Sequence, residues 1–175
     1  MREPLQVNFQ ESAIIPAPVA QVWEWTVNPE HAPHIFSAVI DTWTTAGTPG
    51  EVGHQWIQHE RLPSGKDTLI AQTLVEVVPL RRMVTTAFQD GNHLTLTVTM
   101  REATLAEQVP GVVGEKTWMG LELDGVTERP SLLVWWIRKA VIRNAIKVGR
   151  ESFSRELKEL TAFASRDGAV SPPVE

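Results

Sequence analysis

Residues 54–60 read His-Gln-Trp-Ile-Gln-His-Glu and combine residue types suited to acid–base chemistry with the pattern of a β-strand. Side chains alternate between the two faces of a strand, so Gln58 and Glu60 share a face with Trp56. If that face borders an apolar cavity, burial raises the pKa of Glu60, which can then serve as a general acid or base. The opposite assignment turns this face outward, and a third leaves the polar residues in water near the strand ends.

Two further charged residues, Arg138 and Glu156, project near the centre line of an apolar helical stripe within residues 130–165. One interpretation is that each lies near a helix end and extends its charged group to water. The other is that one of them points into a cavity and meets a polar group of a ligand. Arg138 could hold a carboxylate, enol or phenolate there, or could pair at the surface with Glu122 or Glu128.

Metal and thiol chemistry have little support. His31 and His34 have a spacing that could share one helix face, but no third ligand lies nearby and Pro33 disturbs the helix. The chain has no cysteine, which excludes disulfides, thiolate nucleophiles and zinc–thiolate sites. No phosphate-binding loop, dinucleotide motif or nucleophile elbow is present, so we expect neither a metal nor a cofactor.

The long segment at residues 130–165 is the element that should position these groups. It begins at Pro130, which suits a first helical turn, and it is amphipathic on a 3.6-residue period. Gly149 lies in the middle of the apolar stripe, where glycine costs about 1 kcal/mol relative to alanine, so a close approach to the backbone is expected. Ala145, Gly149 and Ser152 are small residues on one arc, which predicts a groove beneath the helix.

The rest of the chain alternates between strand and turn signals. Residues 9–15 form a first strand, followed by two short helices that Asn28-Pro29 separates. Six further strand segments are expected at residues 38–45, 52–62, 67–78, 82–88, 93–103 and 116–126. The interior should contain Leu94, Leu96, Val98, Met100, Met119, Leu121, Leu123, Val141, Ala145, Val148 and Phe153. This order of elements is typical of an α+β fold with an antiparallel sheet.

Length and composition favour a single globular domain over residues 1–166, with a disordered tail at residues 167–175. The 175 residues carry a formal net charge of −5, which argues against nucleic acid and anionic membrane as partners. No apolar run approaches the length of a transmembrane helix, and the first residues contain no signal-peptide pattern. We therefore expect a soluble, cytoplasmic protein, and its size permits a homodimer.

Four features together resemble the START-like superfamily, often called SRPBCC, which includes birch-pollen-allergen-like proteins and the polyketide cyclase/dehydrase group. Residues 12–31 are similar to its opening strand and "AP…VW…(D/N)P" helix, and residues 49–56 to its glycine turn before a tryptophan-bearing strand. Residues 78–83 are similar to its "PP-R-R-L" hairpin, and the long closing helix completes the series. Rieske-linked members need iron ligands and a further iron–sulfur domain, which this chain has neither the cysteines nor the length to supply.

The resemblance implies a helix-grip fold, in which a curved seven-stranded antiparallel sheet surrounds the long C-terminal helix. It also implies a cavity between them that binds a small hydrophobic or amphipathic molecule, such as a lipid, in a carrier or sensor role. The alternative is an enzyme similar to the polyketide cyclases, with Glu60 as the candidate catalytic residue. We expect the cavity to be lined by Trp56, Gln58, Phe88, Leu96, Val98, Trp118, Trp135, Arg138, Ala145, Gly149 and Ser152.

Overall fold

The computed structural model describes residues 4–62, 64–89, 92–107, 114–127 and 138–167. A first strand is followed by three short helical segments, then by six strands with one 3-10 turn, and finally by a long helix. The elements are β1 (Leu5–Ile15), α1 (Val19–Val27), η1 (Pro29–His31), α2 (Ala32–Ile35), β2 (Val39–Ala46), β3 (Gln55–Arg61), β4 (Asp67–Val78), β5 (Arg82–Gln89), β6 (Asn92–Glu102), η2 (Leu105–Glu107), β7 (Thr117–Thr127) and α4 (Arg138–Asp167).

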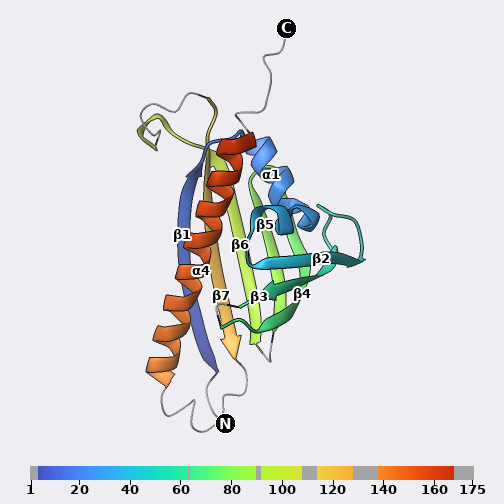
Figure 1. Ribbon diagram of the computed structural model, residues 1–175, viewed down its shortest axis with the longest axis vertical. Helices are drawn as coiled ribbons and strands as arrows, with labels where there is room; N and C mark the ends of the chain where they lie inside the picture. The colour runs from blue at the N-terminus through green and yellow to red at the C-terminus, as the bar shows by residue number, and fades with distance from the viewer. Residues whose placement is uncertain (1–3, 63, 90–91, 108–113, 128–137, 168–175) are drawn as a thin grey trace.

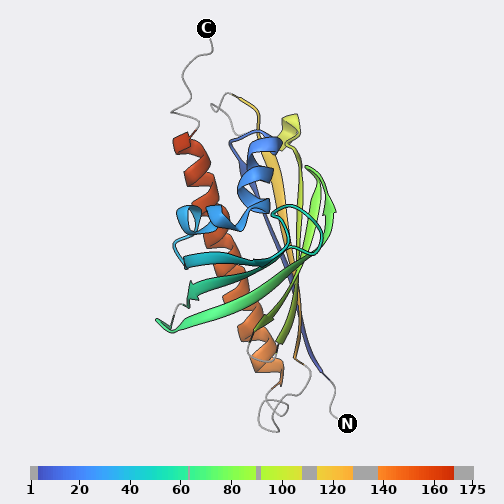
Figure 2. The same ribbon diagram turned by 90° about the vertical axis from the view of Figure 1, so that its right-hand side faces the viewer.

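The strands form one seven-stranded antiparallel sheet in the order β1-β7-β6-β5-β4-β3-β2. Irregularities in the β2–β3 and β4–β5 pairings coincide with strong curvature, as is usual for bulges, so β2 and β3 swing across toward α4 (Figures 1 and 2). The helix-grip fold predicted from the sequence is therefore confirmed. The predicted tail falls almost entirely outside the described residues, since α4 ends at Asp167.

Helix α4 packs on the concave face of the sheet beside β1 (Figure 2). The rings of Phe9 on β1 and Phe153 on α4 meet edge to face, with centroids 5.1 Å apart. A Cβ atom added to Gly149 would lie 2.3 Å from Cζ of Phe9, so only glycine leaves room for this ring. The close approach expected at Gly149 is thus made by Phe9.

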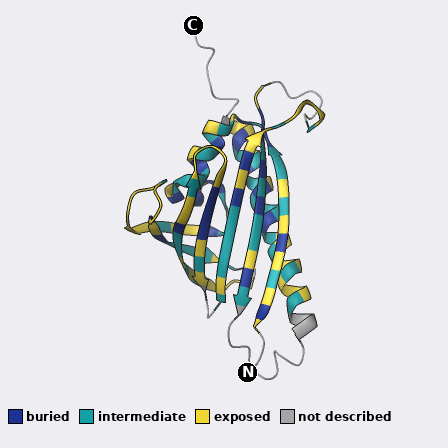
Figure 3. Ribbon diagram, turned by 180° about the vertical axis from the view of Figure 1, so that it is seen from behind, coloured by how far each residue is buried: buried dark blue, intermediate teal, exposed yellow. Residues whose placement is uncertain are grey.

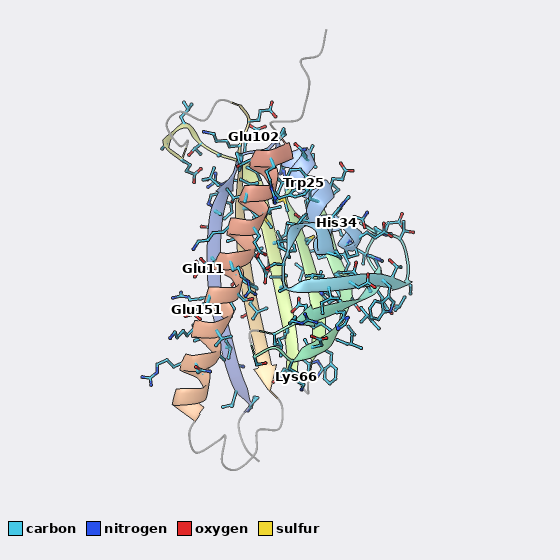
Figure 4. All side chains as sticks on the ribbon, viewed as in Figure 1. Glu11, Trp25, His34, Lys66, Glu102 and Glu151 are labelled. Atoms are coloured by element: carbon cyan, nitrogen blue, oxygen red, sulfur yellow. The ribbon has the colours of Figure 1, made fainter. Side chains whose placement is uncertain are left out.

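The short helices after β1 close the side of the sheet against the C-terminal half of α4. Trp25 of α1 meets Phe163 of α4 edge to face, with ring centroids 5.0 Å apart (Figure 4). After α2, the backbone N–H of Ser37 donates to a carboxylate oxygen of Glu159 at 3.0 Å, and the Ser37 hydroxyl donates to the other oxygen at 2.5 Å. This bidentate contact ties the α1–α2 segment to the long helix.

Replacing Ser37 with Ala removes the hydroxyl donor and leaves the backbone donor in place. Because the contact is charge-assisted but exposed, we expect the free energy of unfolding to fall by about 1 kcal/mol. The measurement is urea denaturation, with Ser165→Ala on the exposed end of α4 as the control. No measurable loss of stability in Ser37→Ala would show that the contact does not hold the segment in solution.

Most of the expected core residues are buried or half-buried, and the two exceptions lie in α4. Val98, Met100, Met119, Leu121 and Phe153 are all buried. Leu94, Leu96 and Leu123 are half-buried. Ala145 and Val148 are exposed, so their assignment to the core was wrong. The N-terminal turns of α4 lie beside β1 at the border of the sheet (Figure 1), which leaves part of the helical stripe uncovered. The structure does not describe the side chain of Val141.

Candidate functional site

A cavity of about 280 Å³ lies between the concave face of the sheet, the α1–α2 segment and α4. Small side chains at Ala38 and Ala87 help to leave this space unfilled. Its walls are mainly apolar and include Phe9, Trp25, Phe36, Val39, Trp56, Ile70, Met83, Leu94, Leu96, Val98, Met119, Leu121, Leu123, Phe153, Leu157 and Leu160.

Strand β3 supplies a polar row to this cavity. Trp56, Gln58 and Glu60 all line it, which settles the orientation of the strand that the sequence left open. The His54 ring stacks on the indole of Trp56, with ring centroids 5.0 Å apart. His54 is fully buried and its Nε2 lies 3.0 Å from the Thr44 hydroxyl, while burial lowers its pKa, so it supports Trp56 as a neutral side chain.

Three side chains form a hydrogen-bonded row along the sheet. The side-chain amide of Gln72 on β4 donates to Oε1 of Gln58 at 3.1 Å, and the amide of Gln58 donates to Oε1 of Glu60. Gln58 therefore donates to the Glu60 carboxylate, and Gln72 orients Gln58 for this contact. Burial nevertheless raises the pKa of Glu60, and the Gln58 hydrogen bond and the positive charge of Arg155 only partly offset that effect.

Glu156 brings a second carboxylate into the cavity from α4. Its Oε1 accepts a hydrogen bond from the Ser152 hydroxyl at 3.2 Å, and the same Ser152 oxygen accepts from Nη2 of Arg155 at 3.2 Å. Burial, followed by the negative charge of Glu60, raises the pKa of Glu156 to about 7. The side chain is half-buried and lines the cavity.

Two further polar groups at the cavity have no hydrogen-bond partner. They are the indole N–H of Trp56, a residue that is 8% exposed, and the hydroxyl of Thr85, which is 2% exposed. Both residues line the cavity. Buried polar groups are nearly always satisfied in folded proteins, and leaving one unpaired costs about 1–3 kcal/mol. These two polar atoms thus lack a partner that a polar atom of a bound molecule could supply.

The charged side chains of the wall are all acidic. Among the described residues that line the cavity there are two glutamates and no lysine, arginine or histidine. The described residues also contain no group of three His, Cys, Asp or Glu side chains that could hold a metal ion. The arrangement can thus supply carboxylate oxygens, amide groups and an exchangeable proton to a bound molecule.

Six residues that the sequence placed at the cavity do line it: Trp56, Gln58, Leu96, Val98, Gly149 and Ser152, together with the candidate Glu60. Trp135 lies outside the described residues. Arg138 is the first residue of α4, but its side chain is not described. The structure also adds Gln72, Thr85 and Glu156, of which only Glu156 had been singled out. Gln72 and Thr85 could have been found from the period-two pattern of β4 and β5.

The other three predicted residues lie elsewhere. Phe88 is on the convex face, 51% exposed and packed against His93, because the inward positions of β5 are occupied by Thr85 and Ala87. Figure 3 shows this face of the sheet, where exposed and more buried residues alternate along the strands. Trp118 also faces outward, with its ring beneath the guanidinium of Arg101 at 4.6 Å. Ala145 is exposed on α4 and does not line the cavity.

The sequence matches no protein-family model and no curated protein. Solved structures, by contrast, match over nearly the whole chain. The ZhuI aromatase/cyclase from Streptomyces sp. R1128 has a TM-score of 0.73 at 16% identity, covering 97% of this chain and 99% of that one. A protein of unknown function from Staphylococcus aureus has a TM-score of 0.73 at 10% identity, covering 95% and 98%.

A START superfamily protein from Mycobacterium smegmatis has a TM-score of 0.66 at 13% identity, covering 91% of this chain and 97% of that one. At such identities the likeness concerns the fold, and it agrees with the strand order and the placement of α4 described above. No described helix is both long enough and apolar enough to cross a lipid bilayer. The chain therefore has the helix-grip fold that it shares with these solved structures, among them a START superfamily protein and an aromatase/cyclase.

Proposed function

We propose that the protein binds a small, largely apolar molecule in the cavity between the sheet and α4. The observation that carries this proposal is the combination of apolar walls with a few polar groups, two of them unpaired. Binding sites for small molecules have this composition, in which apolar walls supply affinity and a few polar groups set the orientation.

The size of the cavity limits the ligand class. A volume of about 280 Å³ lies at the lower end of the range for small-molecule pockets. A compact ring system with a short polar substituent suits this volume better than a long acyl chain. In this proposal the ring lies against Leu96, Val98 and Leu121, and its polar end lies near Glu60 and Glu156.

Filling the cavity should abolish this binding. Ala87 lines the cavity, so Ala87→Leu places extra methyl groups inside it, while Thr86→Leu on the outward face of the same strand is a matched control. The probe is prodan, a neutral naphthalene dye whose fluorescence depends on its environment. We expect Ala87→Leu to weaken prodan binding by about tenfold or more.

In the same titration, Thr86→Leu should bind prodan as the unmodified protein does. Equal binding by both variants, each folded by circular dichroism, would place the dye outside this cavity. Failure of the unmodified protein to bind any neutral naphthalene compound would contradict the proposed function itself.

The paired glutamates favour a second candidate function, acid–base catalysis on the bound molecule by a cyclase-like enzyme. Glu156 has a pKa raised to about 7, close to the value at which a carboxyl group can both give and accept a proton near neutral pH. A poly-β-ketone model substrate tests this candidate. An enzyme would accelerate its cyclisation with a pH dependence that Glu156→Gln abolishes, whereas a binding protein would leave the rate unchanged.

A further inference from the structure

We propose that the polar end of the ligand is a protonated amine, held between the carboxylates of Glu60 and Glu156. This inference rests on the proposed function and names the chemical class of the ligand. It begins from the composition of the described cavity wall, which contains two carboxylates and no cationic side chain. A cavity built for an anion would instead present a lysine, an arginine or converging N–H donors.

The hydrogen bonds around the two carboxylates leave acceptor capacity free. Gln58 donates to Oε1 of Glu60, and Ser152 donates to Oε1 of Glu156. Within the described part of the chain, no donor reaches the second carboxylate oxygen of either residue. An alkylammonium group carries three N–H donors on a compact head, so it can donate to both free oxygens at once.

Charge balance around the pair points the same way. When both glutamates are ionised, the positive charge of Arg155 compensates only one of them, and Glu159 on the same helix adds a further negative influence on Glu156. Two carboxylates in a largely apolar site are unfavourable without further compensation. A single ammonium group would bring Glu60, Glu156 and Arg155 to electrical neutrality.

The unpaired groups of Trp56 and Thr85, which also line the cavity, add a second point of recognition. The Trp56 N–H is a donor, and the Thr85 hydroxyl can donate or accept. A hydroxyl or carbonyl oxygen on the ring of the amine would satisfy either group. The ligand class is therefore a compact ring with an aminoalkyl substituent and, at its other end, an oxygen.

The position of Arg138 on α4 is far along the helix from Glu156. It precedes Gly149, which is the first residue of α4 to line the cavity among those whose side chains are described, by about 16 Å along the helix axis, and Glu156 by about 27 Å. A ligand carboxylate placed at Glu60 and Glu156 would meet two negatively charged side chains. The sequence-based idea of an anionic ligand held by Arg138 is thus separate from this cluster.

Three probes that share one ring system test the proposal: naphthylmethylamine, naphthylmethanol and naphthoic acid. They differ mainly in carrying a cationic, neutral or anionic polar group. At about pH 8, where Glu156 is mostly ionised, isothermal titration calorimetry should show the amine binding about tenfold more tightly than the alcohol. The acid should bind most weakly, because its charge repels both glutamates.

The pH dependence has a defined sign. Bound ammonium favours the ionised form of Glu156, so binding should release protons near neutral pH, and amine affinity should rise between about pH 6 and pH 8. Glu156→Gln and Glu60→Gln should each lower amine affinity by about tenfold and leave alcohol affinity nearly unchanged. Glu151→Gln is the control, because Glu151 lies on the exposed side of α4 (Figure 4).

The outcomes separate this inference from the function on which it rests. If the alcohol or the acid binds as tightly as the amine, the cavity is a binding site but the amine assignment is wrong. If Glu156→Gln binds the amine normally, the assignment is equally wrong. If none of the three probes binds, the proposed function has failed and the amine assignment fails with it.

Discussion

Replacing Glu156 with Gln should stabilise the folded protein at about pH 8, by up to about 3 kcal/mol. Gln has nearly the same shape and can keep the contact with Ser152, but it carries no charge in the cavity. A carboxyl group whose pKa rises from its usual 4.5 to about 7 on folding loses about 3 kcal/mol of stability when it is fully ionised. The true gain will be smaller wherever water reaches the cavity.

The sign follows from proton binding. Between about pH 4.5 and pH 7 the folded protein binds more protons at Glu156 than the unfolded chain does, so stability falls as pH rises through this window. Below it, Glu156 is protonated in both states and the favourable contribution is complete. The advantage of Glu156→Gln should therefore grow from near zero at about pH 4 to its full size at about pH 8.

Urea denaturation at several pH values measures this difference. The control is Glu151→Gln, which removes an exposed charge from the same helix and should change stability by less than about 0.5 kcal/mol at every pH. A Glu156→Gln variant that is no more stable than the unmodified protein at about pH 8 would mean that the carboxylate is well solvated. A gain in stability paired with a loss of amine binding would indicate a group retained for function at a cost in stability.

Replacing Gly149 with Ala should destabilise the protein by about 1–3 kcal/mol, although alanine is the better helix former. Helix propensity alone predicts a gain of about 1 kcal/mol. The added Cβ, however, would lie 2.3 Å from Cζ and 2.5 Å from Cε1 of Phe9, which is buried and packed against Phe153. The ring cannot move without disturbing the contact between β1 and α4, and overpacking of this kind is costly.

A second variant and a matched control make this result interpretable. Phe9→Leu combined with Gly149→Ala should recover part of the stability that each single change loses, because the smaller side chain makes room for the methyl group. Ala145→Gly, at an exposed position of the same helix, should cost about 1 kcal/mol and so calibrate helix propensity in α4. Stabilisation by Gly149→Ala alone would contradict the close packing of Phe9 and Gly149.

The order and type of the main elements could be predicted from the sequence, because each has a local physical signal. The apolar stripe with a 3.6-residue period predicted α4. The helix was expected from Pro130, and the part of it that the structure describes begins at Arg138. Alternation along β6 predicted its inward face, with Val98 and Met100 buried. The break at Asn28-Pro29 separated the short helices, and Asn28 indeed caps the 3-10 turn by accepting a hydrogen bond from Glu30.

Aromatic side chains were the least reliable guide to the cavity. Phe88 and Trp118 both lie on the convex face. For Trp118 the sequence already implied this, because Met119, Leu121 and Leu123 of the same strand were assigned to the interior and side chains alternate between the two faces. A large apolar residue on a strand indicates a pleated, half-buried surface but not which side of the sheet it faces. In the structure both rings have partners outside the cavity, Phe88 at His93 and Trp118 at Arg101.

The periodicity and turn residues of the sequence thus determined the α+β order of elements, the chain segments that form it and a short set of candidate polar residues, because these signals act locally. The helix-grip arrangement followed from the family resemblance. Only the tertiary structure decided that Glu60 and Glu156 share one cavity, since they come from β3 and α4, which are distant in the chain. Their proximity depends on the curvature of the sheet and on how α4 crosses it. Because burial and the charge of Glu60 set the pKa of Glu156, the chemistry of the pair is a property of the folded protein.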